Sequence, residues 1–117
     1  MQVRTTRSSR AACLGLSGEL DLSSADRLRK ALLDICLGRD LVLVDLAAVT
    51  FLDSTVMGLL VAGAKRCAAT GGQLLLTGAQ GDPLRTLTIV GLEHLLLRED
   101  RVRDDLRDEL WELQTQL

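Results

Sequence analysis

The sequence predicts an α/β fold in which helices cover a largely parallel sheet that is preceded by one or two antiparallel strands. Short apolar runs of strand length alternate along the chain with longer segments whose apolar residues recur every three or four positions. Glycine, serine and proline mark most of the junctions between these segments. Strands that alternate with helices in this way are joined by crossover connections, which align the strands in parallel and cover the sheet.

The first segments of the chain predict two strands. Residues Val3–Thr6 have the composition of a short edge strand. Alternating apolar residues at Ala12, Leu14 and Leu16 predict a second strand, which Gly18 interrupts. These segments are the candidates for the antiparallel beginning of the sheet.

An amphipathic helix is expected next. From Ser24 onward the apolar residues step by three and four positions, which is typical of a helix with one buried face. Ser23 or Ser24 is the candidate N-cap, and Gly38 is the expected stop. The apolar stripe consists of Ala25, Leu28, Leu32 and Ile35.

The middle of the chain predicts a central strand followed by a long helix. Residues Leu41–Leu46 form a continuous apolar run, the pattern of a strand that is covered on both faces. A helix is expected from about Ser54 to Thr70, and the pair Gly71-Gly72 ends it. Its apolar face carries Val56, Leu60, Ala64 and Cys67.

The last third predicts two strands and two helices. Residues Gln73–Ala79 form a strand, after which Asp82 and Pro83 are the expected N-cap and first residue of a helix that ends at Gly91. The segment "HLLLR" that follows predicts a short last strand. The final helix is highly charged, and its expected apolar stripe consists of Val102, Leu106, Leu110 and Leu113.

Composition favours one globular domain and argues against two classes of partner. With 117 residues, of which 47% are hydrophobic and 26% charged, the chain is long enough to bury a core. A net charge of -2 and an aromatic content of 2% disfavour nucleic-acid binding, which needs a basic surface and stacking side chains. The longest apolar run, Val56–Ala64, is much shorter than the roughly 20 residues of a membrane span. We therefore expect a soluble, cytoplasmic protein with no membrane or nucleic-acid partner.

The three cysteines are expected to be buried, reduced thiols. Cys13, Cys36 and Cys67 are odd in number, widely spaced and set among apolar residues, which is typical of a protein from a reducing cytosol. Metal-ligand spacing is absent, so neither a metal nor another cofactor is expected.

The sequence also lacks the residues of an enzyme. Asp45 ends a strand as in an aspartate-based phosphatase, but Ala47 stands where such an enzyme needs a second acid. His94 is the single histidine, has no evident partner, and is expected at the surface or at a helix end. No glycine-flanked nucleophilic serine and no phosphate-cradling loop occurs. The prediction is therefore a protein without catalytic residues.

The segment Asp53-Ser54-Thr55 lies between the central strand and the long helix, where functional groups of α/β proteins collect. In one interpretation, Asp53 or Ser54 only caps the helix and stabilises it by about 1 kcal/mol. In the other, Ser54 is a phosphorylation switch and Asp53 holds the turn. Asp21 has a similar capping interpretation, and the charged final helix is either an ordinary solvated helix or a partner-binding element.

The residues resemble the STAS domain of bacterial anti-sigma-factor antagonists over nearly the whole chain, from about Ala12 to Leu110. The resemblance rests on "LSGELDLSSADRLRKAL", "LVLVDLAAVTFLDSTVMGLLV", "GGQLLLTGAQGDPLRTLTIVGLEHLL" and the trailing charged helix. Its most specific element is the Asp-Ser-Ser/Thr turn after the central strand. The resemblance implies a single domain over residues 1–117. It also implies a small mixed β-sheet of four to five strands, with about four α-helices packed mainly on one face.

The resemblance also implies a function. An unphosphorylated antagonist of this family binds an anti-sigma factor, which is itself a serine kinase, and so releases a sigma factor for transcription. The kinase phosphorylates the serine after the aspartate of the turn, here Ser54, and a serine phosphatase removes the phosphate. Asp53 matches the family aspartate, Thr55 the adjacent hydroxyl position, and Asp21 the acidic residue of the first loop. The expected partner-binding residues are Asp21, Asp53, Ser54, Thr55 and Val56.

One residue departs from the family pattern. Val56 stands where family members usually carry glycine, although Gly58 is retained. A β-branched side chain beside the modifiable hydroxyl is expected to restrict the approach of a kinase or to select among related kinases. The alternative function is therefore an unphosphorylated STAS adaptor subunit of a lipid-transport ABC complex. The sequence leaves open whether the protein forms a homodimer.

Overall fold

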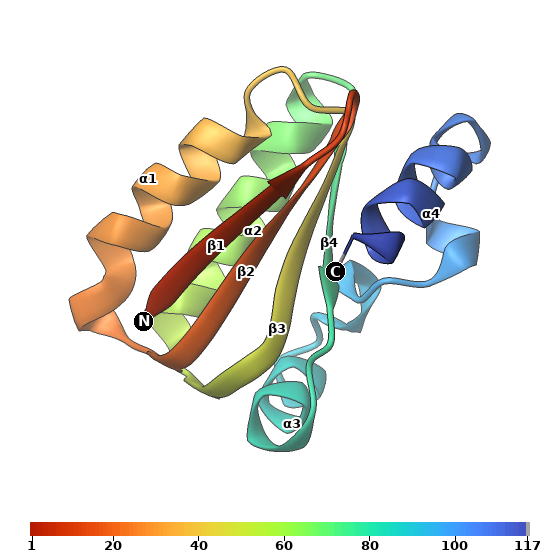
Figure 1. The fold of residues 1–117 in the computed structure, drawn as a ribbon. Coiled ribbons are helices and arrows are strands. Elements are labelled where there is room, and N and C mark those ends of the chain that lie inside the picture. Colours follow the sequence, from red (N-terminus) through yellow and green to blue (C-terminus); the bar gives the residue numbers. More distant parts are fainter. Residues whose placement is uncertain (117) are drawn as a thin grey trace.

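The computed structural model, which describes residues 1–116, contains one mixed sheet with the strand order β1-β2-β3-β4 (Figure 1). Strand β1 pairs with β2 in antiparallel orientation, so that Thr5 lies opposite Leu14. Strands β2, β3 and β4 are parallel, with Leu43 between Cys13 on one side and Leu75 on the other. The predicted parallel sheet with an antiparallel beginning is confirmed.

Apart from the strand expected at "HLLLR", the elements follow the predicted order, with short 3-10 helices (η) at several connections. Their bounds are β1 Gln2–Arg7, β2 Ala11–Leu20, η1 Leu22–Ser24, α1 Ala25–Cys36, β3 Leu41–Leu52, α2 Ser54–Ala69, β4 Gln73–Thr77, α3 Gly81–Ile89, η2 Glu93–Leu95, η3 Glu99–Arg101, η4 Asp104–Leu106 and α4 Arg107–Thr115. Strand β3 is longer than the expected Leu41–Leu46, because it continues to the start of α2. No helix of the described residues is long and apolar enough to cross a membrane.

The apolar run of β3 is buried on both faces because alternate side chains of a strand point to opposite sides of the sheet. Val42 and Val44 join a core cluster formed with residues of α1, α2 and α3. Leu41 and Leu43 join a second cluster, formed with α4 and the segment before it. Most helices therefore pack on one face, as expected, and α4 covers the other face.

Helices α1 and α2 lie side by side behind the sheet (Figure 1). The stripe predicted for α1 is buried, and each such leucine stabilises the fold by roughly 1.5–3 kcal/mol through the removal of apolar surface from water. Gly63 of α2 lies against α1, since a Cβ added there would be 3.6 Å from a methyl group of Leu32, in ordinary van der Waals contact. The three cysteines are free and buried, as predicted.

The predicted N-cap of α3 is wrong. The helix begins at Gly81, with Gln80 in the N-cap position, so Asp82 and Pro83 lie inside the first turn. Proline is tolerated there because the first amide groups of a helix have no partner within the helix. Asp82 instead accepts a 2.7 Å hydrogen bond from Arg85 and places negative charge near the positive end of the helix.

The predicted strand at "HLLLR" is also wrong. Its first part forms η2, and Leu96 makes only an isolated bridge to Leu76 of β4. The side chain of Arg101 donates hydrogen bonds to the carbonyl groups of Glu93 and Leu96, at 2.5 and 2.7 Å. These carbonyls are thereby satisfied without a continued ladder. The predicted stripe of the final helix is buried, but Val102 and Leu106 precede α4.

A close contact between β3 and the end of β4 supplies a test of the packing. Gly78 has a φ of 75°, and an added Cβ would lie 2.8 Å from Oδ1 of Asp45 and 2.9 Å from Cβ of Ala47. Gly91 has nearly the same φ, 79°, but nothing lies within 4 Å of the added atom.

Both glycine-to-alanine substitutions therefore cost roughly 1–2 kcal/mol for the left-handed backbone. We expect Gly78→Ala to cost a further 1–3 kcal/mol or so because the site has no space for the methyl group. Urea unfolding of the two variants measures the difference. Equal free energies of unfolding would contradict the close packing at Gly78.

Candidate functional site

The candidate site begins where β3 passes into α2, and Asp53 forms that junction. Its backbone is extended, with φ -94° and ψ 175°, so it ends the strand and stands at the N-cap of the helix. Oδ1 of Asp53 accepts a 2.9 Å hydrogen bond from the amide of Val56, and its carbonyl accepts one from the amide of Met57 at 3.1 Å. The capping interpretation of Asp53 is confirmed.

The end of β2 lies beside this junction. The amide of Asp53 donates a 3.1 Å hydrogen bond to the carbonyl of Leu20, so Asp21 follows in the chain at the same edge of the sheet. The carboxylate of Asp21 accepts from the amide of Ser23 at 3.0 Å and from its hydroxyl at 2.5 Å. The hydroxyl bond lowers the pKa of Asp21, because it stabilises the charged form.

Asp21 therefore caps the turn η1, in agreement with its capping interpretation. Ser24 occupies the N-cap position of α1, as one of the two predicted candidates, but its side chain makes no capping hydrogen bond. The turn anchored by Asp21 leads the chain into α1 instead. The loop after β2 is thus held by a carboxylate, as is the loop after β3.

Ser54 is the first residue of α2, and both Ser54 and Thr55 are exposed. Neither hydroxyl group makes a hydrogen bond to another residue within 1–116. Because Asp53 already supplies the cap, the hydroxyl of Ser54 has no structural role in the turn. A solvent-facing hydroxyl of this kind is chemically available for modification.

The position of Val56 differs from the expectation that this residue binds a partner and restricts the approach of a kinase. Its side chain is fully buried, with 0% exposure, in the core cluster that α2 forms with the sheet. It therefore offers no contact to a partner and does not obstruct the approach to Ser54. The residue adds apolar volume to the core, and Gly58 leaves open space on the exposed side of the helix.

Two exposed apolar residues at this edge were not predicted. Leu22 in η1 is 70% exposed, and Phe51 near the end of β3 is 48% exposed. Phe51 pairs with Glu19 of β2, and Leu22 directly follows Asp21, so both belong to the same end of the sheet. No signal in the sequence distinguishes them, because each stands near a buried leucine, Leu20 for Leu22 and Leu52 for Phe51.

Asp45 and His94 were the other residues considered as catalytic candidates in the sequence. Oδ1 of Asp45 accepts a 3.0 Å hydrogen bond from the amide of Ala47. His94 lies exposed in η2, as predicted for an isolated histidine. Among residues 1–116, no group of three or more histidine, cysteine or acidic side chains is placed to hold a metal ion.

The fold agrees with the similarity of the chain to known proteins. Residues 2–109 match the family model of the STAS domain, so the chain belongs to the STAS domain family. No curated protein sequence matches the chain significantly.

Three solved structures illustrate the shared fold. The unphosphorylated anti-sigma factor antagonist SpoIIAA has a TM-score of 0.75 and 18% identity, with 92% of this chain and 97% of that chain covered. An anti-sigma factor antagonist from Mycobacterium paratuberculosis has a TM-score of 0.71 and 21% identity, with 97% and 93% covered. A sulfate transporter family protein from Wolinella succinogenes has a TM-score of 0.69 and 23% identity, with 96% and 93% covered. The mixed sheet and its helices are therefore a STAS fold, as the sequence motifs indicated.

The cap at Asp53 is directly testable. We expect Asp53→Ala to lower the free energy of unfolding by about 1 kcal/mol, because the amide of Val56 loses its acceptor. Asp53→Asn keeps a side-chain oxygen at the same position and is expected to retain most of the stability. Urea unfolding of the two variants tests this expectation, and an alanine variant as stable as the asparagine variant would contradict it.

Proposed function

We propose that the protein is an anti-sigma-factor antagonist that is switched by phosphorylation of Ser54. In its unphosphorylated form it binds an anti-sigma factor, which is a serine kinase, and so frees a sigma factor for transcription. Phosphorylation of Ser54 by that kinase ends the binding, and a serine phosphatase restores it. The observation that carries the proposal is the exposed, unbonded hydroxyl of Ser54 at the start of a helix that Asp53 already caps.

Charge provides the switch. A phosphate adds about -1.5 to -2 charges at neutral pH. The free amide groups at the beginning of α2 favour this charge locally. The amide of Val56 is not one of them, because it donates its hydrogen bond to Asp53. Asp21 adds a further carboxylate at the same edge. A partner that covers this edge therefore has to desolvate additional negative charge, so its affinity falls while the fold is preserved.

The docking surface consists of polar and apolar side chains. Asp21, Asp53, Ser54 and Thr55 supply the polar part, and Leu22 and Phe51 extend it with apolar area. Exposed apolar residues beside a polar rim are typical of protein-binding sites, because their burial favours association. In this proposal the protein acts by binding in the cytoplasm and needs neither a catalytic residue nor a cofactor of its own.

The similarity to known structures supports this proposal over its alternative. Two of the compared structures are named anti-sigma factor antagonists. For the alternative, a STAS adaptor of a lipid-transport ABC complex, the third structure indicates only that the same fold also occurs in a sulfate transporter family protein. The argument for an adaptor was that Val56 restricts the approach of a kinase to Ser54. Because the side chain of Val56 is buried, this argument no longer favours the adaptor.

Phosphorylation is tested with the anti-sigma kinase recovered by pull-down from the bacterium that encodes the protein. We expect incubation of kinase, ATP and protein to place one phosphate on Ser54, which peptide mass spectrometry locates. Ser54→Ala is the control and should remain unmodified. A phosphate at another residue with Ser54 unmodified would overturn the assignment, and recovery of a transporter ATPase without a kinase would favour the adaptor.

Binding is tested with matched substitutions at the same position. We expect Ser54→Asp to weaken binding to the kinase at least tenfold, or about 1.4 kcal/mol, because it places negative charge in the interface. Asparagine has nearly the same size as aspartate but no charge, so the Ser54→Asn variant should bind more tightly than the Ser54→Asp variant. Calorimetric titration measures both affinities. Equal affinities would show that charge at residue 54 does not control binding.

A further inference from the structure

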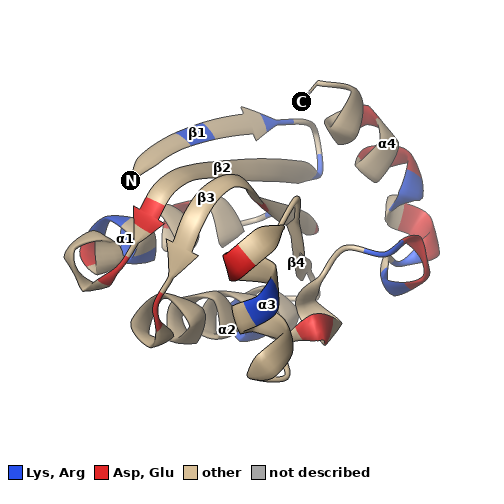
Figure 2. Cartoon of the chain, turned by 90° about the horizontal axis from the view of Figure 1, so that it is seen from below, with Lys and Arg blue, Asp and Glu red and all other residues tan. Residues whose placement is uncertain are grey.

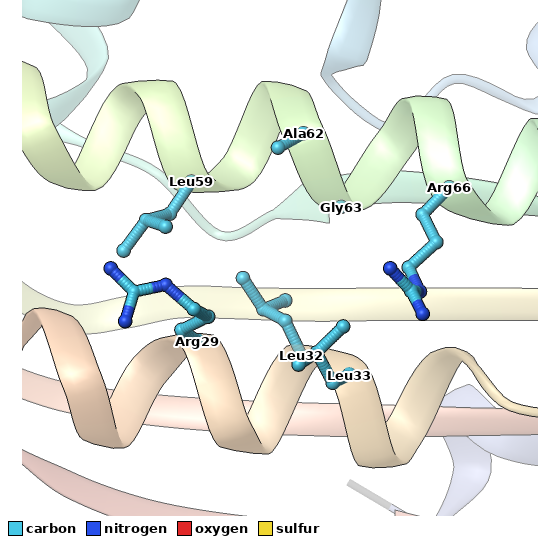
Figure 3. Close-up of a pocket in the computed structure, with 7 residues that line it drawn as sticks. All are labelled: Arg29, Leu32, Leu33, Leu59, Ala62, Gly63 and Arg66. Atoms are coloured by element: carbon cyan, nitrogen blue, oxygen red, sulfur yellow. The ribbon is translucent and has the colours of Figure 1, made fainter.

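A groove of about 300 Å³ lies between α1 and α2, on the side of these helices that faces away from the sheet (Figure 3). Leu32 and Gly63 form its floor, and both are buried. Arg29 reaches from α1 toward Leu59, and Arg66 reaches from α2 toward α1 (Figure 3). The groove is thus an apolar trough with a guanidinium group near each end.

The spacing of these arginines follows from the helix geometry. Arg29 lies beside Leu59, and Arg66 is two turns farther along α2, about 10 Å at 1.5 Å per residue. Arg29 forms an exposed ion pair with Asp26 at 2.7 Å. Arg66 makes no ion pair within the described part of the chain. The groove therefore suits a rod-like group that is apolar in its middle and carries negative charge.

Helix α4 has this chemistry on its outer surface. Trp111 is 72% exposed, the largest apolar side chain among the exposed ones. Asp108 lies three positions before Trp111 and four before Glu112, so its side chain neighbours both of them on the helix surface. Neither Asp108 nor Glu112 forms an ion pair in residues 1–116. The neighbouring acids are already engaged, Asp104 with Arg107 and Asp105 with Arg10.

The two surfaces differ in the sign of their net charge. Basic residues outnumber acidic ones on α1 and α2, where the acids are Asp26 and Asp34. Acidic residues outnumber the arginines, Arg101, Arg103 and Arg107, from η3 to the end of α4, and Figure 2 shows both charges there. The basic residues of α1 and α2 are Arg27, Arg29, Lys30, Lys65 and Arg66. The acidic residues from η3 to α4 are Glu99, Asp100, Asp104, Asp105, Asp108, Glu109 and Glu112. Opposite potentials of this kind favour association of the two surfaces.

We propose that the groove between α1 and α2 binds α4 of a second copy of this chain. Trp111 of that copy enters the apolar trough, and Asp108 and Glu112 face the guanidinium groups of Arg29 and Arg66. A tryptophan that lies between arginines is buried and makes cation–π contacts with them. Tryptophan and arginine are also the residues in which interface hot spots are enriched. Arg107 lies one turn before Trp111, and its ion pair with Asp104 limits its repulsion of the groove.

The positions of the surfaces determine the kind of assembly. The groove lies on the helices that cover one face of the sheet, and α4 covers the other face. A closed pair in which each copy fills the groove of the other would need both surfaces on the same side. The contact is therefore head to tail, and it propagates as an open chain unless the rotation between copies closes a ring.

The oligomeric state tests this proposal, and Trp111 is the only tryptophan, so its fluorescence reports the contact directly. We expect the weight-average mass in sedimentation velocity to rise with protein concentration above the 12.7 kDa monomer and past the dimer, without limit for an open chain and to a plateau for a closed ring. The emission of Trp111 should shift to shorter wavelength over the same range, and added salt should reverse both changes. A mass of 12.7 kDa at every concentration would overturn the proposal, and so would a wild-type dimer that grows no further.

Complementary variants give the sharpest test. The groove variant, Arg29→Glu with Arg66→Glu, and the helix variant, Trp111→Ala, should each lose at least tenfold in association. Mixed together, they should form a 1:1 dimer that does not grow, because one intact α4 then meets one intact groove. Failure of the mixture to associate would contradict the proposal.

Two control variants test whether a change in net charge, or the loss of any exposed apolar side chain, is enough to reduce association. Lys30→Glu with Lys65→Glu changes the net charge as much as the groove variant, at positions on the same helices that do not line the groove. Leu37→Ala removes another side chain that is 72% exposed. Both controls should retain most of the association, and circular dichroism should show that all variants are folded. None of these changes alters Ser54, so their failure leaves the proposed function untouched.

Discussion

Burial of β3 on both faces is the constraint on which the rest of the structure depends. Its side chains alternate between the cluster under α1, α2 and α3 and the cluster under α4, so a slip by one residue would exchange the two sets and disrupt the packing of both clusters. The strand is paired on both edges, with β2 and with β4. Its carboxyl end, and therefore Asp53, has a fixed position relative to the loop after β2.

This fixed end explains how an exposed serine can be modified without loss of the fold. Asp53 satisfies the first turn of α2 and is itself held to Leu20, so the hydroxyl of Ser54 contributes nothing to the cap. Asp53 therefore stabilises the junction, and the adjacent residue Ser54 carries the proposed regulation. A phosphate on Ser54 changes the charge of the surface while the hydrogen bonds of the junction remain in place.

The sequence was sufficient for the features that depend on local chemistry. The order of elements followed from apolar periodicity, and the cap at Asp53 followed from the residue type at a strand-to-helix junction. The periodicity also placed Val56 on the buried stripe of α2. The comparison with the family pattern placed the same residue at the docking surface, and the burial of its side chain shows that the periodicity was the better guide.

Features that depend on contacts between distant segments could not be predicted in the same way. The segment "HLLLR" has the composition of a strand, but Arg101 donates hydrogen bonds to the carbonyl of Leu96 within it and to that of Glu93 just before it. The groove is formed by residues of both α1 and α2, and no local pattern reveals which helices become neighbours. The exposure of Leu22 and Phe51 likewise depends on how the ends of β2 and β3 meet.

Helix α2 contributes to both proposed surfaces, and its length keeps their charges largely independent. Ser54 and Arg66 are about 18 Å apart along the helix at 1.5 Å per residue. Exposed charges are screened over about 8 Å at physiological ionic strength, so a phosphate on Ser54 has little influence at Arg66. Only the end of the groove near Leu59 lies within reach of that charge. Association through the groove and binding at Ser54 are therefore expected to combine nearly additively, with any coupling carried by the Arg29 end.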